Sequence, residues 1–403
     1  MSYKKNKNLR RKQKKKRQKQ RTQIKQKSKT KKAQELKAKA EKALSQFNFQ
    51  QAVDLYSKAL LLVPNDTATM DTLGMIFLET GNQEEAIEMF NQSIKFQPLK
   101  SEVPYMYLGQ LYKGEESVEC FEKGIEILIN EFETIKKKTN QTEEMKTKLE
   151  NLIKEIISGL CSLVEIYMTD LCFNEGAEDR CENYLKKAFE FSEDNFESYL
   201  TLCNLRISQE RNEDAKSSLF TSISLWNNLN IENFLSNESE FLQVVEEIRE
   251  DILTLNNPNV NKMEQEKIFK ENIQLLEQKE EELNEKENEK IIKELESEET
   301  RNDQIKSNLP PLELRIQTCN FLIELGQIEV AIYLLKEILL EQNKEPEIWF
   351  LLATAFDYLH FSDITIPLLH KTLELHKINK QTEDCKKVQL IIEKLENELN
   401  NNK

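Results

Sequence analysis

Residues 52–64 read AVDLYSKALLLVP, and thirty-four positions later residues 86–98 read AIEMFNQSIKFQP. The two stretches carry small, aromatic, small and proline residues at the same offsets. In order along the chain these residues are Ala52, Tyr56, Ala59 and Pro64, then Ala86, Phe90, Ser93 and Pro98. A period of this length, with small residues at fixed positions, is typical of stacked pairs of antiparallel helices.

The pattern is that of the tetratricopeptide repeat, and it predicts an all-α fold. We expect a tetratricopeptide-repeat superhelix, an α-solenoid of about seven helix pairs, preceded by a disordered basic N-terminal arm. The composition agrees, because the 403 residues include only eight Gly and eight Pro and 32% of them are charged. Few helix breakers and many charged residues favour helices over a sheet.

Spacing and composition divide the chain into four segments. We expect the basic arm at 1–34, and helix pairs one to five with trailing helices at 35–260. An acidic charged linker or helix follows at 261–308, and two further pairs with a capping helix occupy 309–403. In the third pair the register is short, so the turn near Gly114 must be abrupt. In the fourth pair the loop after Met168 is longer than usual.

Charge is distributed unevenly along the chain. Residues 1–34 contain seventeen Lys and Arg and no acid, so the net charge of −14 divides into +17 for this arm and −31 for residues 35–403. The acidic body should attract a basic partner. Two interpretations of the arm are open: it contacts an import receptor or rRNA, or it is a solvating tail without a partner. Its densest basic cluster consists of Arg10, Arg11, Lys12, Lys14, Lys15, Lys16 and Arg17.

Motifs that bind nucleotides, metals or membranes are not found. The sequence contains neither G-x-x-x-x-G-K-[ST] nor G-x-G-x-x-G, so no cofactor is predicted. The three histidines lack a metal-ligand spacing, and no Ser or Cys lies in a recognisable nucleophile context. The seven cysteines, with no C-x-x-C pair, suggest reduced and mostly packed thiols. We therefore expect a protein that is not an enzyme, has no membrane segment and is a monomer.

In this architecture the first helix of each pair lines the concave face of the solenoid. Six positions in each of seven pairs point inward, and among these forty-two residues there are nine acids and two bases, Lys37 and Lys113. The acids are Glu41, Asp71, Glu79, Glu165, Glu197, Glu313, Glu324, Glu347 and Asp357, and they are accompanied by Met75, Met106, Tyr107, Met168, Phe350 and Tyr358. Such a groove suits a Lys- and Arg-rich peptide. The alternative is that any acidic protein has acidic helix surfaces.

Several stretches resemble one tetratricopeptide family, the dedicated assembly chaperones of large-subunit ribosomal protein 4. Pro104–Leu111 with Gly114–Ser117 is similar to the shortened third pair of that family. The run Val164–Cys172, E-I-Y-M-T-D-L at its centre, is similar to the family's most distinctive segment and adds Asp170 to the candidate groove beside Glu165 and Met168.

The resemblance implies a ribosome-biogenesis chaperone. Its members bind the basic extension of newly made ribosomal protein 4 in the concave groove, keep it soluble and accompany it to nuclear pre-ribosomes. It therefore implies a cytoplasmic and nuclear location. Two alternatives remain: a general tetratricopeptide scaffold for another basic nuclear protein, and an RNA-associated factor that acts through residues 1–32.

Overall fold

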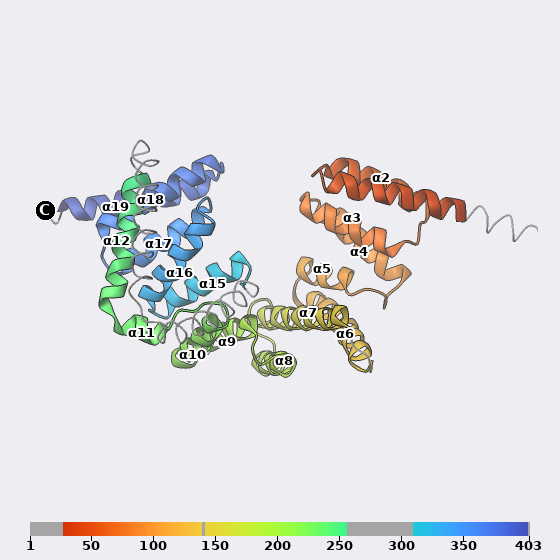
Figure 1. The fold of residues 1–403 in the computed structure, drawn as a ribbon, viewed down its shortest axis with the longest axis horizontal. Coiled ribbons are helices and arrows are strands. Elements are labelled where there is room, and N and C mark those ends of the chain that lie inside the picture. Colours follow the sequence, from red (N-terminus) through yellow and green to blue (C-terminus); the bar gives the residue numbers. More distant parts are fainter. Residues whose placement is uncertain (1–26, 139–141, 256–308, 402–403) are drawn as a thin grey trace, which may run out of the picture. The chain divides into compact units, whose positions relative to one another are not determined.

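The computed structural model describes residues 27–138, 142–255 and 309–401 (Figure 1). Within these ranges every regular element is a helix. The helices form two compact units, one ending at Ser192 and the other beginning at Glu193, and each is described by itself. The acidic segment predicted at 261–308 and most of the basic arm lie outside the described residues.

The start of the first helix corrects one prediction. The arm was expected to be disordered through residue 34, but a helix extends over 27–44, and Ala33 on it is 3% exposed. Ala33, Ala40 and Ala43 are all buried, at helical spacing. The helical face therefore begins before the repeat pattern, because these alanines continue the apolar side of the first pair.

The first compact unit contains four helix pairs. They are formed by the helix over 27–44 with α2 (Phe49–Leu62), α3 (Thr67–Glu79) with α4 (Gln83–Phe96), α5 (Val103–Leu111) with α6 (Gly114–Lys136), and α7 (Glu143–Met168) with α8 (Ala177–Phe191). The turn between α5 and α6 is abrupt, as predicted, and Gly114 has a φ of +58° there. The loop between α7 and α8 is long, also as predicted.

Glycine allows the two helices of a pair to pack closely. A Cβ atom on Gly74 of α3 would lie 2.5 Å from a ring carbon of Phe90 on α4, and one on Gly109 of α5 would lie 2.6 Å from Phe121 of α6. Phe90 is completely buried. At these two pairs the sequence pattern has a steric origin, because the glycine on the first helix accommodates an aromatic ring from the second.

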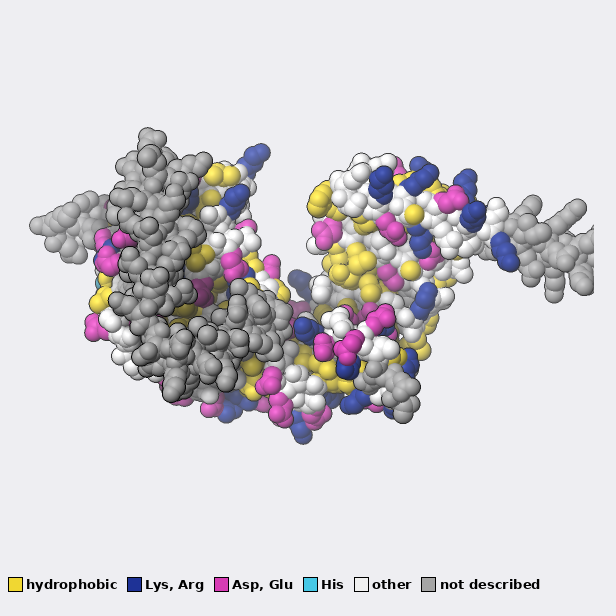
Figure 2. Space-filling view, viewed as in Figure 1, with side chains coloured by type: hydrophobic (Ala, Val, Ile, Leu, Met, Phe, Trp, Pro, Cys, Tyr) yellow, Lys and Arg dark blue, Asp and Glu magenta, His cyan; other side chains and the backbone are white. Residues whose placement is uncertain are grey.

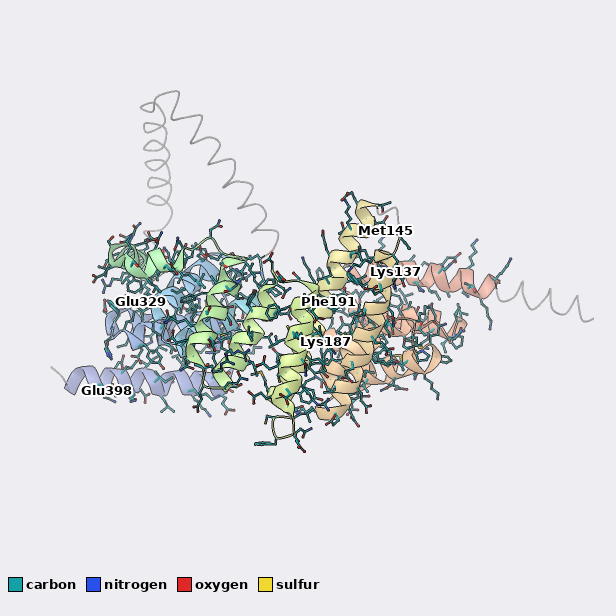
Figure 3. All side chains as sticks on the ribbon, turned by 90° about the horizontal axis from the view of Figure 1, so that it is seen from below. Lys137, Met145, Lys187, Phe191, Glu329 and Glu398 are labelled. Carbon is teal, nitrogen blue, oxygen red and sulfur yellow. The ribbon has the colours of Figure 1, made fainter. Side chains whose placement is uncertain are left out.

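Helices α6 and α7 are longer than the others and form a hairpin. Figure 3 shows Lys137 and Met145 together at its far end, and Phe191 on the neighbouring α8. The rings of Phe132 and Phe191 meet edge to face at a centroid distance of 5.6 Å. Lys148 and Glu131 form an ion pair across the hairpin at 2.5 Å. The described part of the charged stretch over 130–150 thus extends α6 and α7.

The second compact unit contains three further pairs, which brings the described pairs to seven. They are α9 (Phe196–Ser208) with α10 (Asn212–Ser224), α15 (Leu312–Glu324) with α16 (Ile328–Glu341), and α17 (Pro346–Tyr358) with α18 (Ser362–Ile378). Helix α19 (Thr382–Asn401) packs on α18 as the expected cap. Helix α15 contacts both α9 and α10. The stack therefore continues directly from the fifth pair to the sixth.

Two helices described between α10 and α15 lie along the outside of this stack. Helices α11 (Ile231–Ser236) and α12 (Glu238–Leu255) pack against α16, and α12 also packs against α18 (Figure 1). Phe234 on α11 is 2% exposed, and its ring centroid lies 5.3 Å from that of Tyr333 on α16. Arg249 on α12 forms an ion pair with Asp363 at 3.0 Å. Helices α16 and α18 are second helices, so α11 and α12 pack on the side of the stack that the second helices form.

Candidate partner-binding surface

The predicted groove residues fall into two sets, one in each compact unit. The first unit holds Glu41, Asp71, Met75, Glu79, Tyr107, Glu165, Met168 and Asp170. The second unit holds Glu197, Glu313, Glu324, Glu347 and Asp357. All but Asp170 lie on the first helix of a pair, as the repeat register predicts.

Four of the acids lie in the last turn of a first helix. Glu79 and Glu324 are the final residues of α3 and α15, and Glu165 and Asp357 lie in the last turns of α7 and α17. All four are exposed, and none of these last turns contains a base. A carboxylate at a helix C-terminus opposes the helix dipole by about 0.3–1 kcal/mol. Helix stability therefore does not account for these acids.

Three other acids lie in first turns, where the same dipole favours them. They are Glu197 of α9, Glu313 of α15 and Glu347 of α17, the last two thirty-four positions apart. Glu313 and Glu347 are exposed, and Glu197 is half-buried. A stabilising effect on the helix explains these residues without a partner. They add negative charge to the surface but are weaker evidence for a function than the last-turn acids.

The carboxyl of Glu165 is held in surroundings that disfavour its charge. The residue is exposed, yet the nearby protein desolvates the carboxyl and raises its pKa above 4.5, the ordinary value for glutamate. A cationic partner would relieve the penalty, because an opposite charge favours the ionised form.

The position of Asp71 corrects the predicted groove. Its side chain is only 7% exposed, and its Oδ1 atom is buried without a hydrogen-bond partner. Burial raises the pKa of this carboxyl, an effect that a hydrogen bond with Ser93 of α4 opposes. Asp71 therefore lies at the contact between α3 and α4. Its place in the repeat register does not distinguish an inward-facing position from an interhelical one. Asp71 is therefore not part of the exposed surface.

One of the two predicted groove bases is already paired. The Nζ atom of Lys37 lies 3.0 Å from the Oδ2 atom of Asp66, which precedes α3. The pKa of Asp66 is lowered, since the hydrogen bonds from Lys37 and Thr69 outweigh the desolvation that would raise it. Lys113, the other base, is exposed just before α6. Lys37 is therefore not free to repel a basic partner.

Apolar side chains accompany the acids. Met75, Tyr107 and Met168 are half-buried, and the ring of Tyr107 stacks on Phe90 with a centroid distance of 5.3 Å. Figure 2 shows apolar side chains gathered over α3, α4 and α5, with single acidic side chains beside them. In the second unit Tyr358 is 62% exposed at the end of α17. Carboxylates beside apolar groups suit side chains that combine a long aliphatic stem with a cationic head.

Asp170 has a structural role that the sequence did not reveal. It lies in the loop between α7 and α8, and its Oδ2 atom accepts a hydrogen bond from the backbone N–H of Gly114 at 3.0 Å. Gly114 is the first residue of α6, so the carboxylate caps that helix from a distant part of the chain. The predicted contact with a partner remains a prediction, but the loop needs this side chain for its own structure.

The remaining predictions concern the basic arm, metal ions, membrane segments and cysteines. The basic cluster of Arg10, Arg11, Lys12, Lys14, Lys15, Lys16 and Arg17 lies outside the described residues. In the described ranges, no group of His, Cys, Asp and Glu is arranged to hold a metal ion, and no helix is long and apolar enough to cross a bilayer. The seven cysteines are free thiols and four of them are buried, which confirms the predicted packing.

Comparisons with known proteins agree with the repeat and with the resemblance. A family model described as tetratricopeptide repeat matches residues 69–98. The chain is 29% identical over 175 residues to the "Probable assembly chaperone of rpl4" of Schizosaccharomyces pombe, covering 42% of this chain and 49% of that protein. It is 28% identical over 191 residues to a protein of the same name from Emericella nidulans, covering 45% and 44% respectively. The chain thus spans about half the length of the curated relatives it matches.

A solved structure matches more of the chain. It is described as the assembly chaperone of RpL4 (Acl4), residues 1–338, and aligns with a TM-score of 0.57 at 20% identity. The alignment covers 82% of this chain and 98% of that one. At this identity the match shows the fold, a tetratricopeptide-type helical solenoid. Together with the curated relatives, it confirms the resemblance predicted from the sequence.

Proposed function

We propose that this protein is a ribosome-biogenesis chaperone for large-subunit ribosomal protein 4. In this proposal it binds the basic extension of the newly made client along the acidic surface of its first helices, without catalytic turnover. It keeps the client soluble in the cytoplasm and delivers it to pre-ribosomes in the nucleus. The names of the two curated relatives support the client's identity.

One structural observation supports the mode of binding. Glu79, Glu165, Glu324 and Asp357 are exposed in last turns of first helices, where each carboxylate opposes its own helix dipole. Residues that reduce helix stability in the same place in four pairs are expected where a partner requires them. Each exposed pair with a Lys or Arg contributes only about 0.2–1 kcal/mol, so binding relies on many contacts. RNA, a dense polyanion, would then compete for the client and release it.

Charge reversal at these four positions tests the proposal. We expect the combined variant Glu79→Lys, Glu165→Lys, Glu324→Lys and Asp357→Lys to bind Schizosaccharomyces pombe rpl4 on the order of a hundredfold more weakly than the parent. A lysine is favoured at a helix C-terminus, so lost binding would not be explained by unfolding. Affinity would be measured by titration at about 0.1 M salt, where surface charges are only partly screened.

A matched control carries the same change in net charge elsewhere. Asp54, Glu88, Glu119 and Glu190 are exposed on the second helices α2, α4, α6 and α8. Their reversal to lysine should weaken rpl4 binding much less. Equal losses in both variants would mean that net charge alone attracts the client. A parent chain that binds RNA but not rpl4, and loses RNA when residues 1–26 are removed, would favour the RNA-associated alternative.

A further inference from the structure

The loop between α7 and α8 displays a phenylalanine almost completely to water. Phe173 is 99% exposed, the highest value among the exposed large apolar residues of the described chain. The loop begins directly after Glu165 and Met168, which are candidate groove residues at the end of α7. Single apolar residues are common on protein surfaces, so exposure alone carries little weight. The structure of the loop is what makes Phe173 informative.

This loop is tied to the rest of the first unit on both sides of Phe173. Before it, Asp170 accepts the hydrogen bond from Gly114 N–H at 3.0 Å, and the side chain of Leu171 is 9% exposed. After it, the Nδ2 atom of Asn174 donates to the carboxylate of Glu115 at 3.0 Å. Backbone bonds from Asn174 to Leu171 and from Ala177 to Asn174 close the loop on itself. The backbone on both sides of Phe173 is therefore held in place, although the Phe173 side chain itself makes little contact with the protein.

An aromatic residue on a fixed backbone is well suited to binding, because only its two side-chain torsions have to be ordered when a partner arrives. Aromatic residues are also enriched among those that dominate binding energies. The loop and the start of α6 determine what kind of partner would fit. Residues 113–116 and 174–180 contain five acids and two bases, so the surroundings of Phe173 are negative. An arginine side chain can lie flat on a phenylalanine ring and also pair with a carboxylate.

We propose that Phe173 is an anchor for a Lys- and Arg-rich polypeptide, an arginine of which stacks on its ring at the end of the α7 surface. The partner is the same basic client segment that the acidic surface binds, so this inference rests on the proposed function. It adds a short-range contact to long-range attraction between charges. The contact would select a segment with arginine at one position, which charge alone does not do.

Phe173→Ala tests the anchor, and Phe47→Ala is its matched control. Phe47 is another phenylalanine of the first unit, 81% exposed in the turn before α2. We expect Phe173→Ala to bind Schizosaccharomyces pombe rpl4 about tenfold more weakly than the parent, and Phe47→Ala to bind within about twofold. The Phe173→Ala loss should persist at 0.5 M salt, because stacking is less screened than pairing between exposed charges. Phe173→Trp should bind at least as well as the parent, since tryptophan offers the best face to a cation.

The outcomes separate this inference from the proposed function. If the parent binds rpl4 and Phe173→Ala binds equally well, the anchor is wrong and the chaperone proposal stands. If Phe173→Ala and Phe47→Ala lose affinity equally, the effect is not specific to the loop and the anchor is again wrong. If the parent does not bind rpl4 at all, the proposed function fails first, and the anchor falls with it. Thermal unfolding of each variant should match the parent, because both side chains are exposed.

Discussion

The carboxylate of Asp170 accepts a hydrogen bond from the backbone N–H of Gly114 at 3.0 Å, although fifty-six residues separate them. Gly114 begins α6 with a φ of +58°. Its N–H lies in the first turn, where no carbonyl of the same helix can accept it. The bond therefore joins the third helix pair to the fourth. It also gives the E-I-Y-M-T-D-L run a structural reason for its aspartate, distinct from any contact with a partner.

Replacing Asp170 should reduce stability. We expect Asp170→Ala to lower the free energy of unfolding by about 0.5–2 kcal/mol, the usual effect of losing a side chain that caps a helix. Asp170→Asn should retain most of the stability, because the amide oxygen can still accept the hydrogen bond. Urea unfolding of both variants checks this. If Asp170→Ala were as stable as the parent, the bond to Gly114 would contribute nothing and the residue would be a surface charge.

Close packing at Gly74 leads to a second prediction. A methyl group there would lie 2.5 Å from the ring of Phe90, so Gly74→Ala should destabilise the first unit by about 1–3 kcal/mol through overpacking. Adding Phe90→Leu removes the ring that the new methyl meets. The double variant should therefore be less destabilised than the sum of the two single variants, as measured in a double-mutant cycle. Additive losses would show that the two residues do not compete for the same space.

Much of the fold could be predicted from the sequence because its causes are local. A small residue on a first helix and an aromatic residue on the second, Ala40 with Tyr56, are followed thirty-four positions later by Gly74 with Phe90, so the period reflects contacts within each pair. The apolar spacing over 230–258 likewise predicted helices. It did not predict that they cover α16 and α18, because Phe234 and Val245 reveal a buried face but not the surface they pack against.

The candidate surface was harder to predict at the level of single residues. Repeat positions place a residue on a helix but do not distinguish an open face from a contact between helices, which is why Asp71 was assigned to the groove. Pairing also depends on tertiary structure, as for Lys37 with Asp66. A signal was available for the strongest candidates. Glu79 and Glu324 each stand thirteenth from the start of a first helix, where a helix would favour a base.

The contact between α11 and α16 makes a third prediction. Phe234 is buried against Tyr333 and Phe241, so Phe234→Ala should destabilise the second unit by about 3–5 kcal/mol. The neighbouring Leu235 is 42% exposed on the same short helix, and Leu235→Ala should change the free energy of unfolding by less than about 1 kcal/mol. Chemical denaturation of the two variants tests whether α11 is part of the core. Equal and small changes in the free energy of unfolding would mean that α11 contributes little to the core of the second unit.

We expect the Glu165 carboxylate to lower the stability of the folded protein and to favour binding of the client. Both effects should depend on pH. Desolvation raises the pKa of its carboxyl in the folded state above the ordinary 4.5. Below the unfolded value the carboxyl is protonated in both states and folding carries no penalty. As the pH rises through the raised pKa, the folded protein holds a poorly hydrated carboxylate that the unfolded chain hydrates fully, so stability is lost. Glu165→Gln should therefore be more stable than the parent at pH 7, and the difference should vanish as the pH falls to about 4.

The same variant should bind rpl4 more weakly, by roughly two- to fivefold at pH 7, because one exposed charge is removed. Lowering the pH toward the pKa of Glu165 should weaken the parent more than Glu165→Gln, since only the parent has this charge to lose. Glu79→Gln is the control for charge removal in the last turn of another first helix. Thermal unfolding and rpl4 titration over pH 4–8 measure both effects. A Glu165→Gln variant that is less stable than the parent at pH 7 would show that the carboxylate is satisfied within the protein and needs no basic partner.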